Sequence, residues 1–202
     1  MISEILHGYE SAAGQLVPAF EALSSTEVLS PVMDVLNGSY GRTLDIGAGT
    51  GRDAAWLAAR GHDVVAVEPV HQFRVAGICL HQSPRIQWVD DSLPHLKTVI
   101  ESEASFDLIL VVGVWQHVSP NDRRAAMRSI RRLAAVNGRV VISVRHGPGA
   151  VTRPCFPTTD VETIEMAQKC GLALLDSRRA LSIQKGNRDV GVTWTWLVLA
   201  AF

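Results

Sequence analysis

The chain has 202 residues, with 19 Lys and Arg side chains against 20 Asp and Glu side chains, so its formal net charge at pH 7 is −1. This length predicts one domain with a core of its own, and 47% hydrophobic against 19% charged residues excludes intrinsic disorder. The near-zero charge argues against a protein that grips a polyanion over its whole surface, because phosphate binding needs clustered Lys and Arg.

The cysteines and the ends of the chain predict a cytoplasmic protein without a metal site. Cys79, Cys155 and Cys170 are widely spaced and form no C-x-x-C pair, and the histidines show no H-x-H or H-x-x-x-H pair. The N-terminus lacks the positive charge and apolar run of a signal peptide. The longest apolar stretch, Leu197 to Phe202, is far shorter than the roughly 20 residues of a membrane helix.

The first third of the chain predicts helices followed by a strand and a glycine-rich turn. Met1 to Leu36 reads as helical, with Ser24-x-x-Glu27 as a capping box. Thr43–Ile46 is a short apolar strand that stops at a run of glycines. A helix is predicted from about Arg52 to Arg60, with Gly61 at its C-terminal end.

The middle of the chain alternates strands with helices. Strands are predicted at Asp63–Val67 and Ile86–Val89, and helices at about Val70–His81 and His95–Glu103. Phe106–Val112 is an almost unbroken apolar run, which is typical of a central parallel strand covered on both faces.

A further helix and strand complete the alternating part. Ser119 as N-cap and Pro120 at the first position predict a helix that ends at Asn137-Gly138. Val140–Val144 reads as a buried strand, and the Gly- and Pro-rich segment from His146 to Pro157 as a loop. The alternation predicts an α/β fold with a mostly parallel sheet.

The last third predicts a change to antiparallel pairing. Thr159-x-x-Glu162 is a capping box that opens a helix to about Cys170. Leu172–Leu175 and Val192–Ala200 read as strands joined by Ser182–Gly191 with no helix between them, which predicts a hairpin. No linker or repeat divides the chain, so residues 1–202 are expected to form a single domain.

The glycine-rich turn predicts a ligand site. Leu44-Asp45-Ile46-Gly47-Ala48-Gly49-Thr50-Gly51 lies at the carboxyl end of the first strand, where ligands of open α/β sheets bind. Glycines let the chain turn sharply and let a ligand approach the backbone. Glu68 ends the next strand, where a carboxylate can accept hydrogen bonds from the two hydroxyls of a ribose.

The spacing of the glycines favours S-adenosylmethionine over NAD. A dinucleotide fingerprint is G-x-G-x-x-G, but Arg52 stands where its third glycine would be. Asp45 adds a negative charge near the turn. This charge would repel a pyrophosphate and attract the ammonium and sulfonium groups of S-adenosylmethionine.

At these residues the sequence resembles the class I S-adenosylmethionine-dependent methyltransferases, with the match covering about Arg42 to Arg145. Residues 44–51 look like their first motif, and Val65-Ala66-Val67-Glu68-Pro69 like their ribose-binding strand end. Asp90-Asp91-Ser92-Leu93-Pro94 is similar to the segment whose acidic residue holds the adenine amine, and either aspartate fits that role. Val112-Gly113-Val114-Trp115-Gln116-His117 is similar to the strand end beside the methyl group.

The resemblance implies a three-layer α/β sandwich with helices on both faces of a seven-stranded, mostly parallel sheet. The implied strand order is 3-2-1-4-5-7-6, with strand 7 antiparallel. Residues 1–36 would form a helical lid and 42–202 a Rossmann-like core. The implied cofactor is S-adenosylmethionine, with S-adenosylhomocysteine as product. The residues implied for its binding are Tyr9, Asp45, Ile46, Gly47, Ala48, Gly49, Gly51, Arg52, Asp53, Glu68, Pro69, Asp90, Asp91, Ser92, Leu93, Val112, Gly113, Val114 and Trp115.

Five residues are candidates for substrate binding or catalysis. Gln116 and His117 follow the fourth strand, and His117 is either a general base or part of the pocket wall. Arg145, His146 and Arg153 form either an anion-binding edge or a set of solvated loop charges.

Other features have a plainer interpretation. Tyr9 either closes over the cofactor, as the resemblance implies, or simply packs. Trp194 and Trp196 are expected in the core or on a sheet face. One predicted helix carries arginines on a solvated outer face, and without interleaved aromatic residues they make a nucleic-acid partner unlikely; they are Arg123, Arg124, Arg128, Arg131 and Arg132.

These observations predict methyl transfer from S-adenosylmethionine to a small-molecule acceptor by in-line displacement. So short a chain leaves little room for a separate target-recognition domain. The alternatives are a non-catalytic S-adenosylmethionine-binding or partner subunit, a methyltransferase acting on RNA or protein, and an NAD-dependent enzyme. The sequence leaves the oligomeric state and the acceptor atom open, and a general base is needed only where the nucleophile arrives protonated.

Overall fold

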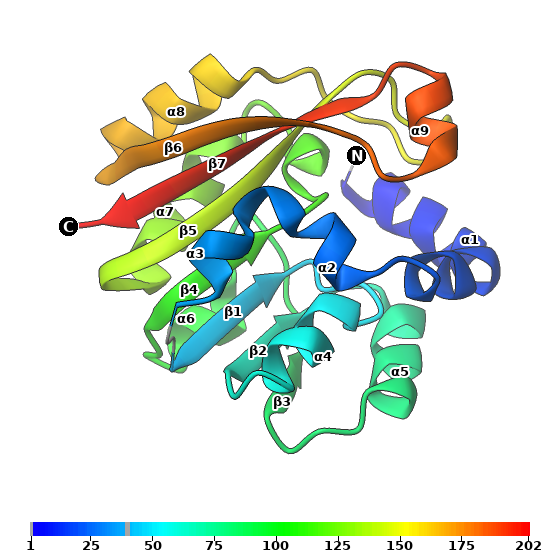
Figure 1. Ribbon diagram of the computed structural model, residues 1–202, viewed down its shortest axis with the longest axis horizontal. Helices are drawn as coiled ribbons and strands as arrows, with labels where there is room; N and C mark the ends of the chain where they lie inside the picture. The colour runs from blue at the N-terminus through cyan, green and yellow to red at the C-terminus, as the bar shows by residue number, and fades with distance from the viewer. Residues whose placement is uncertain (1, 39–40) are drawn as a thin grey trace.

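A seven-stranded sheet runs through the molecule in the order β3-β2-β1-β4-β5-β7-β6 (Figure 1). The computed structural model describes residues 2–38 and 41–202. Neighbouring strands are parallel from β3 to β5, and β7 is antiparallel to both β5 and β6. The predicted strand order and the antiparallel β7 are therefore confirmed. The strands are β1 (Arg42–Ile46), β2 (Asp63–Val67), β3 (Ile86–Val89), β4 (Phe106–Val111), β5 (Ala134–His146), β6 (Leu172–Leu181) and β7 (Thr193–Ala201).

Helices cover both faces of the sheet and give the molecule three layers. One face carries α6, α7 and α8, whose buried side chains include Val99, Met127 and Ala167. The opposite face carries the segment from α2 to α3 and α4, with Leu29 and Leu57 among its buried side chains. Figure 1 shows α2, α3 and α4 in front of the sheet and α6 and α7 behind it. The helices are α1 (Ile2–Glu21), α2 (Ser25–Val28), η1 (Ser30–Val32), α3 (Met33–Leu36), α4 (Arg52–Ala58), α5 (His71–Leu80), α6 (Lys97–Glu101), η2 (Trp115–His117), α7 (Arg123–Leu133), α8 (Asp160–Lys169) and α9 (Lys185–Asp189).

The central position of β4 explains its apolar sequence. Its residues alternate between the two helical layers, so Ile109 belongs to one hydrophobic cluster while Leu108 and Leu110 belong to the other. All residues of β4 except Asp107 are buried, as the unbroken apolar run predicted. The first predicted residue of the N-terminal helical segment, Met1, lies outside the described residues.

Two predicted connections differ from the structure. The helix predicted from Pro120 begins at Arg123, because Ser119 and Asp122 form a hydrogen-bonded turn before it, and it ends at Leu133, where β5 begins. The segment between β6 and β7, predicted to contain no helix, holds α9, whose single turn is closed by Lys185 Nζ and Asp189 Oδ2, 2.7 Å apart. This short polar turn has no apolar periodicity to reveal it.

The two predicted capping boxes behave differently. Thr159 accepts a hydrogen bond from the Glu162 N–H at 3.1 Å and caps α8 as predicted. Ser24 precedes α2 but makes no side-chain cap hydrogen bond.

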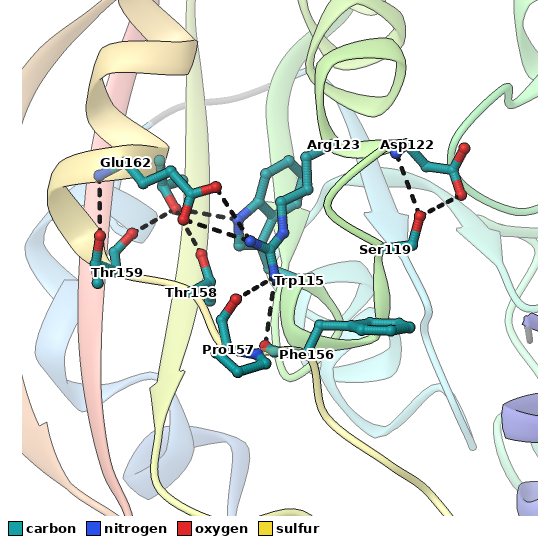
Figure 2. A network of polar contacts seen from close by, with 10 residues as sticks. Trp115, Ser119, Asp122, Arg123, Phe156, Pro157, Thr158, Thr159 and Glu162 are labelled. Carbon is teal, nitrogen blue, oxygen red and sulfur yellow. Dashed lines mark hydrogen bonds and ion pairs between the residues drawn. The ribbon is translucent and has the colours of Figure 1, made fainter.

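Arg123 corrects the prediction of a wholly solvated arginine face on α7. Its side chain is 1% exposed, and it forms an ion pair with Glu162 of α8 at 3.2 Å. It also donates from Nη2 to the carbonyl oxygens of Phe156 and Pro157 (Figure 2). Residue 123 lies four and seven positions before Met127 and Ile130, on the core-facing stripe of the helix. Arg123 therefore fastens the end of the loop after β5 to α7 and α8.

We expect Arg123→Met to destabilise the fold by about 2–4 kcal/mol, because it leaves Glu162 and two carbonyl groups without their charged donor. Arg124→Met is the matched control, since its side chain is exposed on the same helix, and it should change stability by less than about 0.5 kcal/mol. Urea denaturation measures both. Equal losses of unfolding free energy in the two variants would contradict the role of Arg123 in fastening the loop after β5.

Candidate functional site

A cavity of about 690 Å³ lies at the carboxyl edge of the parallel strands. The strand ends and their turns form its floor, α1 covers one side, and the segment around α9 reaches its far side. Twenty of the residues predicted to bind cofactor or substrate line this cavity: Tyr9, Asp45, Ile46, Gly47, Ala48, Gly49, Arg52, Asp53, Glu68, Pro69, Asp91, Ser92, Leu93, Val112, Gly113, Val114, Gln116, His117, Arg145 and Arg153.

The turn after β1 requires glycine at its first position. Gly47 has a φ of +71°, and a Cβ there would lie 2.4 Å from Cγ2 of Val114. The N–H groups of Gly47 and Ala48 both donate to the carbonyl of Val67, at 2.7 and 2.9 Å. The turn is thus fastened to the end of β2 and pressed against the end of β4, so that three strand ends meet at the cavity.

Glu68 holds the turn from the side of β2. Its carboxylate accepts the Gly49 N–H at 2.8 Å through Oε2 and the Val70 N–H at 2.8 Å through Oε1. Burial raises the pKa of Glu68 to about 7, although these two hydrogen bonds act in the opposite direction. Each carboxylate oxygen retains a second lone pair for a ligand hydroxyl.

Asp45 is a buried carboxyl group without a hydrogen-bond partner for one oxygen. The residue is 4% exposed, and within residues 2–38 and 41–202 its buried Oδ2 has no hydrogen-bond partner. Burial, followed by the nearby Asp53 carboxylate, raises the pKa of Asp45 to about 8. A cationic ligand in the cavity would relieve both effects, so the residue fits the ammonium or sulfonium charge of S-adenosylmethionine and disfavours a pyrophosphate.

The structure separates the two neighbouring aspartates that the sequence left open. Asp91 lines the cavity and accepts the N–H groups of Ser92 and Val99, at 2.8 and 3.2 Å. Asp90 points elsewhere, because its carboxylate pairs with Arg74 at 2.5 Å. Asp91 is therefore the one positioned to face a ligand in the cavity.

Tyr9 and His117 connect α1 to the end of β4. The Tyr9 hydroxyl lies 2.8 Å from Nε2 of His117, and Nδ1 of His117 lies 3.1 Å from the carbonyl oxygen of Pro154. Because a carbonyl only accepts, Nδ1 carries the proton, and Nε2 accepts from Tyr9. Burial lowers the pKa of His117 and raises that of Tyr9 to about 12, so both groups are neutral at pH 7.

Four predicted site residues do not line the cavity. Besides Asp90, Trp115 is fully buried and donates from Nε1 to Thr163 Oγ1 of α8, which turns its indole into the core. His146 is hydrogen-bonded to Thr195 Oγ1 of β7 at 2.8 Å. Gly51 is the N-cap residue of α4, with a φ of +78°, and lies against the ring of Trp88.

Several cavity residues were missed by sequence reasoning. Phe20 and Phe73 pack their rings 5.6 Å apart between α1 and α5 and line the cavity. Trp196 belongs to a hydrophobic core cluster and Trp194 packs against it, as expected, but both also border the cavity. β7 is antiparallel to β5, and its Trp194 and Trp196 pair with Arg145 and Ser143 near the carboxyl end of β5, which borders the cavity. That pairing was predicted only as a topology, without its register.

Neither a metal-binding cluster nor a membrane-spanning helix is present among the described residues. No group of three His, Cys, Asp or Glu side chains among residues 2–38 and 41–202 is arranged to hold a metal ion. In the same part of the chain no helix has the length and apolar character needed to cross a membrane.

Comparison with known proteins points to one family. Residues 44–142 match the family model described as a methyltransferase domain. The chain is similar to an uncharacterized methyltransferase of Alkaliphilus oremlandii, at 28% identity over 66% of this chain and 58% of that protein. It is also similar to one of Mycobacterium tuberculosis, at 32% identity over 49% of this chain and 37% of that protein. The chain thus spans less than two thirds of these curated relatives.

Solved structures share the fold. The 1,6-didemethyltoxoflavin-N1-methyltransferase of Burkholderia thailandensis, with 1,6-didemethyltoxoflavin and S-adenosylhomocysteine bound, has a TM-score of 0.76 at 24% identity, over 98% of this chain and 88% of that one. The N-methyltransferase NodS of Bradyrhizobium japonicum, in complex with S-adenosylhomocysteine, has a TM-score of 0.68 at 15% identity, over 88% and 85%.

Fold and site together define a Rossmann-like α/β protein with a ligand cavity at the carboxyl edge of its sheet. Residues 44–142 thus match a methyltransferase-domain family, and the strand order of the sheet is the one that the resemblance to class I S-adenosylmethionine-dependent methyltransferases implied.

The buried carboxyl of Asp45 predicts a pH-dependent stability. A carboxyl whose pKa is raised on folding binds its proton more tightly in the folded state, so ligand-free stability falls as the pH rises from about 4, the unfolded value, towards 8. We expect Asp45→Asn to flatten this fall and to raise the melting temperature at pH 8 by roughly 3 °C or more. Asp63→Asn, at an exposed position on β2, should leave the pH dependence unchanged. Thermal denaturation from pH 5 to 8 measures this pH dependence. Parallel curves of melting temperature against pH for wild type and Asp45→Asn would refute the prediction.

Proposed function

We propose that the protein transfers a methyl group from S-adenosylmethionine to a small-molecule acceptor by in-line displacement. The observation that carries this proposal is the pair of buried carboxyl groups, Asp45 and Glu68, on either side of a glycine turn in a covered cavity. Cationic and hydroxyl-bearing groups of one ligand would satisfy both carboxyls. The family match supports the reaction class.

Three carboxyl groups of the cavity would each bind a different part of the cofactor. Asp45 would face the cationic methionine end of the cofactor, Glu68 the ribose hydroxyls and Asp91 the adenine amine. Once bound, S-adenosylmethionine supplies an electrophilic methyl group on a positively charged sulfur. The strand ends hold the nucleophile close to this methyl and collinear with its leaving bond, and such positioning supplies several kcal/mol of the barrier reduction.

A small acceptor is favoured by two observations. The cavity is covered on one side by α1, which we propose acts as the lid of a single-domain enzyme. The Burkholderia protein holds 1,6-didemethyltoxoflavin, and a glycopeptide N-methyltransferase, MtfA, has the same fold with a TM-score of 0.64 at 14% identity, over 89% of this chain and 94% of that one. The acceptors of these two proteins are 1,6-didemethyltoxoflavin and a glycopeptide, neither of which is a nucleic acid or a protein.

His117 is the group best placed to receive a proton from the acceptor. Its Nδ1 proton is fixed by the Pro154 carbonyl, which leaves Nε2 as an acceptor facing Tyr9 in the cavity. The nucleophile would form a bond to the methyl carbon as the sulfur kept the electron pair of the breaking bond. Because the lone pair of Nε2 already accepts from Tyr9, a proton on the nucleophile would pass to the Tyr9 oxygen while the Tyr9 hydroxyl proton passed to Nε2. For a nucleophile that arrives without a proton, His117 serves only as pocket wall.

We expect Glu68→Asp to weaken S-adenosylhomocysteine binding by about tenfold or more, because the shorter side chain withdraws from the ribose hydroxyls. Glu165→Gln, exposed on α8, is the control and should bind as wild type does. Isothermal titration measures both. Stabilisation by NAD in a thermal shift assay, with none by S-adenosylhomocysteine, would instead indicate a nicotinamide enzyme.

Activity is tested by incubating cell extract with isotope-labelled S-adenosylmethionine and identifying the labelled product. With that acceptor, His117→Asn should lower kcat by roughly 10²-fold or more while changing S-adenosylhomocysteine affinity less than about threefold. The wild-type rate should fall only at a pH below the ordinary histidine pKa of 6.5, because burial lowers the pKa of His117. Unchanged kcat would assign His117 to the pocket wall. Cofactor binding without any labelled product would favour a non-catalytic subunit.

A further inference from the structure

Two arginines of the cavity wall have no carboxylate partner. Arg145 comes from the end of β5 and Arg153 from the loop that follows. The third arginine of the wall, Arg52, is held by both oxygens of Asp53, at 2.9 and 2.8 Å. Within residues 2–38 and 41–202, neither Arg145 nor Arg153 forms an ion pair. Four arginines outside the cavity wall, like Arg52, do form one: Arg74, Arg85, Arg123 and Arg178.

Most hydrogen-bond donors of these two guanidinium groups are unused. Arg145 donates from Nη2 to the Pro148 carbonyl at 2.6 Å and to Asn187 Oδ1 at 3.1 Å, and its Nη1 makes no hydrogen bond to the described residues. The guanidinium of Arg153 also makes none within the described chain and lies 5.2 Å from the Tyr9 ring centroid. Because a guanidinium carries five donors, both groups can still bind an anion.

The carboxyl groups predicted to face the cofactor and the two unpaired arginines belong to different strand ends of the cavity. Asp45 lies near the carboxyl end of β1, and Glu68 and Asp91 follow β2 and β3, on the side predicted for the cofactor. Arg145 lies near the end of β5, and Arg153 immediately precedes Pro154, whose carbonyl contacts His117, so both arginines belong to the side of the cavity around His117. Both also lower the pKa of His117 electrostatically. The half that surrounds His117 is therefore positive.

Aromatic rings flank the positive half. The guanidinium carbon of Arg145 lies 5.4 Å from the centroid of the Trp194 ring, and Trp196 lines the cavity two residues further along β7. Tyr9 contributes a ring below Arg153. Flat apolar surfaces beside unpaired guanidinium groups are complementary to a planar ring that carries an acidic substituent.

We propose that the methyl acceptor is a small aromatic or heteroaromatic acid, whose anionic group binds Arg145 and Arg153 while its ring lies against Trp194 and Tyr9. This inference rests on the proposed methyltransferase function and deepens it. The anion directs the ring so that its nucleophilic atom lies near His117. A neutral analogue leaves both guanidinium groups without their anion, so the site discriminates against it.

The test titrates matched acids and amides into protein saturated with S-adenosylhomocysteine. The probes are para-hydroxybenzoate and para-hydroxybenzamide, nicotinate and nicotinamide, and anthranilate and anthranilamide, followed by ligand-detected NMR. We expect at least one acid to bind and its amide to bind about tenfold more weakly or not at all. Arg153→Gln should weaken the acid by about tenfold or more and leave S-adenosylhomocysteine affinity unchanged.

Two further variants keep the result interpretable. Arg145→Lys retains the charge at the strand end without the planar fork and should weaken the acid to a smaller extent than Arg153→Gln does. Arg128→Gln removes an exposed charge from α7, away from the cavity, and should bind the acid as wild type does.

The outcomes separate the two proposals. Equal binding of acids and amides, no binding of any acid, or unchanged acid binding in Arg153→Gln overturns the anionic acceptor while leaving methyl transfer intact. Failure of the wild-type protein to bind S-adenosylhomocysteine in the first step overturns the proposed function itself.

Discussion

The site depends on keeping two carboxyl groups, Asp45 and Glu68, out of water at the same edge of the sheet. Burying a carboxylate is costly unless its charge is compensated. Glu68 receives two backbone hydrogen bonds, but the buried Oδ2 of Asp45 receives none within the described chain. The close packing at this edge requires Gly47, because only a residue without Cβ lets the end of β1 approach Val114 so closely. The cavity is therefore prepared for a ligand that brings a positive charge to Asp45.

The division of charge across the cavity gives each reactant its own place. In the proposed reaction, the carboxyl groups of the acidic half would favour a methyl donor that carries a positive charge over its neutral thioether product. The basic half, around Arg145 and Arg153, disfavours the cationic donor and favours an anion. The proposed donor and acceptor would then be sorted by charge, with His117 and Tyr9 between the two halves.

The parts predictable from sequence were those with a local physical signature. A few adjacent residues were enough to predict the β4 strand, the glycine turn and the position of Glu68. The resemblance to the family added the strand order. Arg123 was misplaced because its charge outweighed its position on the core-facing stripe of α7, where Glu162 compensates it. Trp194 and Trp196 reach the cavity through the register of β7 against β5, a long-range pairing that no local pattern specifies.

The chemical state of His117 shows why a catalytic role could not be assigned from the sequence. A histidine can accept a proton only where its other nitrogen is already protonated, and here that tautomer is set by the carbonyl of Pro154. Pro154 lies in a loop whose neighbouring residue Phe156 is held on both sides, by the Gln116 carbonyl and by the buried guanidinium of Arg123. The orientation of one imidazole thus depends on an ion pair between α7 and α8. The residues that prepare His117 are therefore found in the loop and the helices behind it, and not beside it in the chain.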